Sequence, residues 1–237
     1  MSKATSMDLP VERLGPWLER AIPGFRGLGS ARKFAGGQSN PTFLLEADSG
    51  RYVLRRKPPG ALLASAHAVD REYRVLRALA DTAVPVPRAL ALCADDAVIG
   101  SMFYVMEFLD GRILWDPELP ELGNERRARV YDEMNRVLVA LHGVDVAAAG
   151  LADYGQPGNY YARQLGRWTK QYRAAETGRI EAMEELVAWL GERMPADDGR
   201  VVLVHGDYRL DNLMFDAVED RIVAVLDWEL STLGHPF

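Results

Sequence analysis

The change of hydrophobic pattern near Gly111 is the feature that most restricts the fold of this chain. Before it, short apolar runs alternate with clusters of Gly, Asn, Ser and Pro, which is typical of strands joined by turns. After it, apolar residues recur at helical spacing over long segments. The pattern predicts an α+β fold, with a strand-rich N-terminal lobe over residues 1–108 and a mostly helical lobe over residues 109–237.

The N-terminal part contains five predicted strands and one predicted helix. Turn clusters divide residues 31–56 into three runs that we expect to form an antiparallel meander. A helix is expected from about Ala66 to Ala80, because apolar residues fall on one stripe there. Pro85 and Pro87 end it, and two further strands are predicted at 89–93 and 102–108.

The C-terminal part has three predicted helices. The first ends near His142 and carries its apolar stripe at i, i+4, i+7 and i+11, and the others span about 159–174 and 179–194. Two short apolar runs follow, at 201–205 and 221–228. These runs bracket a polar loop, and we expect them to be strands.

Composition excludes several classes of protein. The formal charge is −6 and the pI about 5.3, which disfavours non-specific nucleic-acid binding. The sequence has no run of 18 apolar residues and no secretory signal pattern at its start, so we expect no membrane partner and a cytoplasmic location. Cys93 is the only cysteine, which excludes an internal disulfide and a Cys-rich zinc site.

The polar loop His205–Asn212, with the sequence HGDYRLDN, carries the strongest chemical signal. Phosphoryl transfer to a hydroxyl needs a carboxylate that accepts the hydroxyl proton, and oxygen ligands for magnesium. Asp207 and Asn212 lie five residues apart after a predicted strand and suit these two tasks. Asp227, at the end of the next apolar run, supplies a second metal ligand. The alternative is that His205 packs and the polar residues cap a turn.

A glycine-containing turn lies upstream, between the first two predicted strands. Its residues Gly37, Gln38, Ser39 and Asn40 could place backbone N–H groups over phosphates. The segment lacks a GxGxxG pattern, and an ordinary hairpin turn is the alternative.

The segment RYVLRR is predicted to place two side chains on one face of a strand. Val53 could lie over adenine while Arg55 reaches the phosphates, and Glu72 on the next helix can pair with that cation. Lys57 is a second candidate for the phosphate anchor. The alternatives are an arginine on an exposed strand and a glutamate that faces water.

The segment Met106–Leu109 leaves a predicted strand for a linker. Such a hinge can bind the edge of adenine through the carbonyl of Glu107 and the N–H of Leu109. An ordinary strand end is the alternative.

Taken in order, GGQSN, VLRR, Glu72, MEFLDG, LHGVD, HGDYRLDN and LDWE resemble the aminoglycoside phosphotransferase family of kinase-like enzymes. The resemblance runs from about Phe34 to the last residue. It implies a bilobal protein-kinase-like fold that uses ATP with Mg²⁺ and a hydroxyl acceptor. By matched position it implies Asp207 as the base, Asn212 and Asp227 as metal ligands, and Arg55 with Glu72 as the phosphate-anchoring pair.

The segments VLRRKPPG and DWELSTLGHP resemble, more closely still, the kinase-like domains associated with acyl-CoA dehydrogenases. The family continues past the DWE segment for roughly a hundred residues of mostly helical chain, so the C-terminal part of the helical lobe is expected to be missing here. The chain is then either a fragment or a natural short product. An incomplete lobe would expose apolar faces, and we expect self-association or partner binding through them.

The sequence therefore predicts an ATP-dependent phosphotransferase that acts on a hydroxyl of a small molecule, such as a hydroxyacyl thioester or a similar metabolite. The alternative is a nucleotide-binding or partner-binding module without efficient turnover, because the acceptor-binding segment is absent. The residues leave the identity of the acceptor open.

Overall fold

The computed structural model describes residues 9–34, 40–58 and 69–237. The chain forms two compact units. The first holds residues 1–140 and 207–230, and the second holds residues 141–206 and 231–237. The lobe boundary expected near residue 108 stays a prediction.

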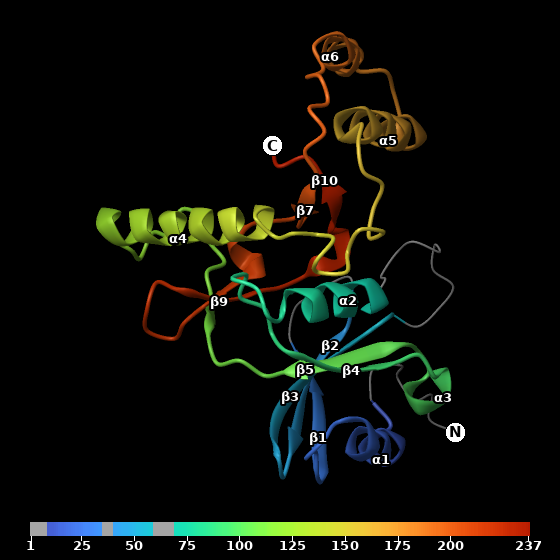
Figure 1. The fold of residues 1–237 in the computed structure, drawn as a ribbon, viewed down its shortest axis with the longest axis vertical. Helices are drawn as coiled ribbons and strands as arrows, with labels where there is room; N and C mark the ends of the chain where they lie inside the picture. Colours follow the sequence, from blue (N-terminus) through green and yellow to red (C-terminus); the bar gives the residue numbers. More distant parts are fainter. Residues whose placement is uncertain (1–8, 35–39, 59–68) are drawn as a thin grey trace. The chain divides into compact units, whose positions relative to one another are not determined.

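An antiparallel sheet of five strands forms the centre of the first unit, in the order β1-β2-β3-β5-β4 (Figure 1). Its strands are β1 (Leu28–Lys33), β2 (Thr42–Ala47), β3 (Gly50–Arg56), β4 (Ala89–Cys93) and β5 (Phe103–Glu107). The five predicted strands are thus confirmed. The largest difference in boundaries is at β1, which begins three residues before the predicted run.

One face of this sheet packs on α1 (Val11–Ala21) and the short helix α3 (Asp96–Ile99). Alternate residues of each strand point to this face, because side chains alternate along a strand. Fully buried side chains such as Leu45, Leu54 and Val105 form its core together with Leu14 and Leu18 of α1. This packing fixes which residues face the other way.

Helix α2 (Val69–Leu79) contacts β4 and β5. Its buried residues recur at i, i+3, i+6, i+7 and i+10, so one stripe faces the protein. Glu72 lies within that stripe. A charged residue at a buried position of a helix requires a partner of opposite charge.

A second sheet of the first unit has the order β6-β8-β9. Its strands are β6 (Arg112–Ile113), β8 (Leu213–Phe215) and β9 (Ile222–Val225). The 3₁₀ turn η1 (Leu210–Asn212) directly precedes β8, and the 3₁₀ turn η2 (Trp228–Leu230) follows β9. The strand predicted over 221–228 is therefore shorter than expected, because Asp227 adopts φ 63° and leaves the extended conformation.

Helix α4 (Asn124–His142) confirms the helix that was predicted to end near His142, and Val130 and Val137 on its apolar stripe are fully buried. The second unit contains α5 (Tyr160–Ala175), α6 (Glu181–Glu192), β7 (Val202–Val204) and β10 (Thr232–Gly234). Strands β7 and β10 pair in an antiparallel ladder. Neither α5 nor α6 has a fully buried residue. No helix in the described ranges is long and apolar enough to cross a lipid bilayer.

Candidate functional site

A cavity of about 340 Å³ lies in the first unit, against the face of the five-stranded sheet that α1 and α3 leave uncovered. Its walls are mostly apolar, with a few polar side chains, which is the usual composition of a small-molecule site. The residues that line it are Phe34, Thr42, Val53, Arg55, Leu76, Pro87, Tyr104, Met106, Glu107, Phe108, Leu109, Asp110, Gly111, Ile113, Met214, Val225, Leu226, Asp227 and Trp228.

The strand register brings several lining residues together. Arg55 pairs with Thr42 on one side and Tyr104 on the other, so these three side chains form a row across the sheet. Val53 pairs with Met106 in the next row on the same face. The apolar row is where the aromatic part of a ligand would lie, and the row that contains Arg55 offers positive charge.

The chain leaves β5 along the cavity at Glu107 and Leu109. The side chain of Glu107 accepts a hydrogen bond of 2.7 Å from the backbone N–H of Arg88, which fixes this end of the strand. Within the described ranges no hydrogen bond engages the backbone N–H of Leu109. The segment therefore lines the cavity and has a backbone donor without a partner among the described residues.

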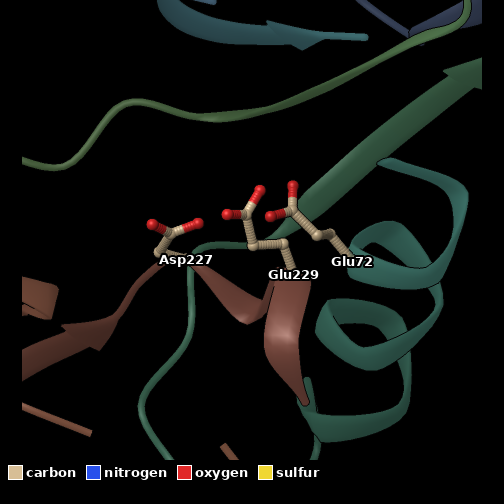
Figure 2. A group of neighbouring side chains, drawn as sticks. All are labelled: Glu72, Asp227 and Glu229. Carbon is tan, nitrogen blue, oxygen red and sulfur yellow. The ribbon is translucent and has the colours of Figure 1, made fainter. Parts of the chain in front are cut away.

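The guanidinium of Arg55 lies among three carboxylates. Its Nε is 2.9 Å from Oε2 of Glu72, and its second amino group donates a short hydrogen bond to Oδ1 of Asp227 and lies 3.9 Å from Oε2 of Glu229. The Nε–Glu72 contact is an ion pair without the alignment of a hydrogen bond. Figure 2 shows the three carboxylates, which come from α2 and from the segment around η2.

Burial and neighbouring charges together shift the pKa values of this cluster. Burial raises the pKa of Glu72, and the negative charges of Asp227 and Glu229 raise it further, against the attraction of Arg55. For Arg55, burial acts to lower the pKa, but the surrounding carboxylates outweigh it and raise the pKa. Tyr104, whose hydroxyl donates to Glu72 over 3.2 Å, has a raised pKa because it is buried and faces that carboxylate.

Backbone contacts fix the positions of the loop and of Asp227. Leu213 pairs with Val225 across β8 and β9, and the N–H of Leu226 donates to the carbonyl of Asn212 over 2.9 Å. Asn212 therefore lies beside the residue that precedes Asp227. The left-handed φ of Asp227, which an Asp tolerates better than most residues, ends β9 and turns the carboxylate toward Arg55.

The side chains of Asp207 and Asn212 contact each other directly. The amide nitrogen of Asn212 donates to the carboxylate of Asp207 over 3.0 Å and to its carbonyl over 2.9 Å. Arg209 lies 3.3 Å from the same carboxylate. The side chain of Asp207 is 39% exposed, so a ligand from solvent can reach it.

The donor set fits a hard divalent cation. One carboxylate oxygen each from Glu72, Asp227 and Glu229 lie within 4.8 Å of one another. Two buried side-chain oxygens, Oε1 of Glu72 and Oδ1 of Asn40, have no hydrogen-bond partner within the described ranges. Carboxylate and amide oxygens are the ligands that Mg²⁺ takes in proteins.

The structure places the other predicted residues as follows. Gly37, Gln38 and Ser39 lie outside the described residues. Asn40 is 2% exposed, and its amide nitrogen donates to Oε2 of Glu229 over 3.1 Å. Lys57 is not among the described residues that line the cavity.

Two residues of the cluster were not predicted from the sequence. Glu229 follows Asp227 by two residues in the LDWE segment, and that second acid was the available signal. Tyr104 carried no signal, because a tyrosine in a strand is ordinary and its contact with Glu72 joins a strand to a helix.

The similarity of this chain to known proteins agrees with the geometry. The sequence model of the phosphotransferase enzyme family matches residues 30–237. This chain belongs to that family. Its sequence is 54% identical over 215 residues to a protein named probable acyl-CoA dehydrogenase IBR3 of Arabidopsis thaliana, an alignment that covers 86% of this chain and 26% of that protein.

Solved structures of the phosphotransferase family have the same fold. A protein from Ralstonia eutropha that is assigned to the aminoglycoside phosphotransferases is 52% identical, with a TM-score of 0.87 over 96% of this chain and 67% of that one. A streptomycin–ATP ternary complex of APH(2″)-IIa is 18% identical, with a TM-score of 0.63 over 97% of this chain and 73% of that one, and shows the fold alone. The fold is therefore the α+β, kinase-like fold of phosphotransferases. The chain spans about a quarter of the length of the curated relatives it matches.

Proposed function

We propose that this chain is an ATP-dependent phosphotransferase that moves the γ-phosphate to a hydroxyl of a small molecule. One observation carries the proposal. A single cavity is lined by the Glu107–Leu109 segment at the end of β5 and by Arg55 and Asp227. A nucleotide needs a base-recognition edge and a phosphate-binding group in one cavity, and these residues suit the two tasks.

The lining residues suit the parts of ATP. Val53, Leu76 and Met106 offer apolar contact to adenine, and the carbonyl of Glu107 with the N–H of Leu109 offers hydrogen bonds to its edge. Arg55 offers a permanent positive charge to the phosphates. The ATP complex of a protein with the same fold supports this choice of nucleotide.

The residues that would hold magnesium are Asp227 and Asn212, with Glu229 close to Asp227. When bound, the ion would neutralise charge on the phosphates. The amide nitrogen of Asn212 donates to Asp207, so the amide oxygen is the atom left for the ion.

Asp207 is the proposed general base. Its carboxylate accepts the proton of the acceptor hydroxyl while the hydroxyl oxygen forms a bond to the γ-phosphorus. The bond between that phosphorus and the β–γ bridging oxygen breaks, and ADP leaves. Asn212 orients the carboxylate through its hydrogen bond, and Arg209 supplies a nearby positive charge.

The proposed acceptor is a hydroxyacyl thioester or a similar hydroxylated metabolite. The chain matches about a quarter of relatives that are named as acyl-CoA dehydrogenases. A segment joined to such an enzyme in one protein supports an acyl thioester as the acceptor. Aminoglycosides are not the favoured acceptor, because they are cationic and would need an acceptor pocket lined by carboxylates.

The test is product formation by the 237-residue chain with ATP and Mg²⁺. Hydroxyacyl-CoA compounds, matched acyl-CoA compounds without the hydroxyl, and aminoglycosides are incubated separately and analysed by mass spectrometry. We expect a phosphorylated product from a hydroxyacyl-CoA only, and none with Asp207→Asn. ATP-dependent phosphorylation of none of these acceptors, by a protein that binds ATP, would favour the module without turnover.

The helices of the second unit support a further part of the proposal, association of the chain with a second copy of itself. Several large apolar side chains of this unit are exposed, namely Trp168, Ile180, Leu186, Trp189 and Leu190. Sedimentation velocity tests this. We expect a concentration-dependent dimer in the parent and a monomer in the Trp168→Glu, Trp189→Glu double variant. Location in the cytoplasm stays a prediction.

A further inference from the structure

Arg55 is a resident cation in the carboxylate cluster. It contacts Glu72 and Asp227 at the same time, and its amino group lies 3.9 Å from Glu229. An arginine is charged at every physiological pH, so this positive charge is always present. Any other cation that binds these carboxylates must share them with Arg55.

The cluster still has more negative than positive charge. Three carboxylates surround one guanidinium. Oε1 of Glu72 has no hydrogen-bond partner among the described residues, although Glu72 is 1% exposed. Asn40 gives an independent observation. Its amide nitrogen donates to Glu229, and its buried oxygen is without a partner within the described ranges. Buried oxygens without partners are costly, and a hard divalent cation satisfies such oxygens.

The carboxylate of Asp227 is a candidate partner for two cations, the guanidinium of Arg55 and a metal ion. Oδ1 of Asp227 accepts the hydrogen bond from Arg55, and Asp227 is also a proposed ligand of the metal ion together with Asn212, whose carbonyl accepts from the N–H of Leu226. Two positive charges cannot both lie close to Oδ1 of Asp227 without strong repulsion. An ion held by the other oxygen of Asp227 would still lie close to the guanidinium, so Arg55 opposes its binding.

We propose that Arg55 is an internal competitor of the divalent cation, a regulation of the site that rests on the proposed function. In the nucleotide-free protein Arg55 holds Asp227 and keeps metal affinity low. When ATP brings its phosphates, the amino group of Arg55 moves from Asp227 to a phosphate oxygen and Asp227 turns to the ion. Glu72 keeps Arg55 in the cavity throughout. Metal ion and nucleotide then bind with positive coupling.

The experiment measures Mn²⁺ binding to the nucleotide-free 237-residue chain by electron paramagnetic resonance. We expect Arg55→Gln to bind Mn²⁺ about tenfold more tightly than the parent, because a competing positive charge is gone. The same variant should bind ATP more weakly than the parent. Arg55→Lys should lie between the two for Mn²⁺, since one ammonium lacks the fork that spans Glu72 and Asp227.

Arg51→Gln is the matched control. Arg51 lies on the same strand, and its ion pair with Asp110 is exposed, so its removal changes the net charge equally but leaves the cluster intact. We expect parental Mn²⁺ affinity for it. Circular dichroism checks the fold of each variant, and if Arg55→Gln does not fold, Arg55→Lys against Arg51→Gln carries the test. Unchanged or weaker Mn²⁺ binding by the folded Arg55 variants overturns the proposal and leaves the phosphotransferase activity a separate question.

Discussion

Two charged clusters of the first unit have opposite arrangements of charge. In one, the guanidinium of Arg55 lies among the carboxylates of Glu72, Asp227 and Glu229. In the other, the carboxylate of Asp220 lies among three guanidiniums, from Arg112, Arg126 and Arg129. Both join segments that are far apart in the sequence.

Solvent exposure separates the two clusters. The side chains of Arg126 and Arg129 are 41% and 56% exposed, so water hydrates their excess positive charge. In the Arg55 cluster the side chains of Glu72, Asp227 and Glu229 are 1%, 32% and 18% exposed, so water hydrates its excess negative charge less. We therefore interpret the Asp220 cluster as a structural element and the Arg55 cluster as a candidate ligand site. Substitutions in the Asp220 cluster should therefore affect stability, and substitutions in the Arg55 cluster should affect ligand binding or turnover.

The largest expected effect lies at Asp207, in the loop beside the Arg55 cluster. Asp207→Asn should lower turnover by about 10²–10⁴, the usual contribution of a positioned base, and leave ATP affinity close to the parent value. Steady-state kinetics and calorimetry measure the two quantities. Turnover near the parent value would remove Asp207 from this role.

The next effect distinguishes two metal ligands. Asp227→Ala should raise the Mg²⁺ concentration needed for half-saturation in the presence of ATP by about 10-fold to 100-fold, and more than Asn212→Ala does. A carboxylate binds a hard cation more strongly than an amide oxygen does. Equal Mg²⁺ midpoints for both variants and the parent would contradict the assignment.

A smaller effect tests the ion pair between strand and helix. Arg55→Ala and Glu72→Ala should each weaken ATP binding, with a coupling free energy of about 1–2 kcal/mol in the double-mutant cycle. Arg55→Lys should be tolerated for ATP binding. If the two losses simply add, the pair does not act as a unit, and Lys57 becomes the better candidate for the phosphate anchor.

Local sequence pattern predicted the strands and the long helices. Strand β4 occupies the predicted residues 89–93, and α4 ends at the predicted His142. Helix α1 was not predicted, because Gly15 and Pro16 inside it weaken the helical signal. Strands β8 and β10 have three residues each, too few for a periodic pattern, and depend on pairing with distant partners.

Residues of the candidate site could be predicted where the spacing of residue types within one segment indicates their role. Asp207, Asn212 and Asp227 came from such spacing, and their roles stay predictions. The contact of Asn40 with Glu229 joins residues 189 positions apart, so no local pattern could indicate it. The excess negative charge of the cluster likewise depends on tertiary burial.

The smallest expected effect tests the structural cluster. The pKa of Asp220 is lowered to about 2, mainly by the hydrogen bond from Arg126 and also by Arg112, against the opposing effect of burial. Because the folded pKa lies below the unfolded value of about 3.9, the carboxylate stabilises the folded protein above about pH 4. This stabilisation is lost as the pH falls toward 2.

Asp220→Asn should therefore lower the free energy of unfolding by about 1 kcal/mol at pH 7, a value kept small by the exposed arginines. Urea unfolding at a series of pH values measures it, and the difference from the parent should shrink between about pH 4 and pH 2 as the parent carboxylate is protonated. Glu219→Gln, at the exposed ion pair with Arg221, is the control and should leave stability near the parent value. ATP affinity should be unchanged in both variants. Asp220, Arg126 and Arg129 are not among the described residues that line the cavity, so a loss of ATP binding in Asp220→Asn with the fold intact would contradict the separation of the two clusters.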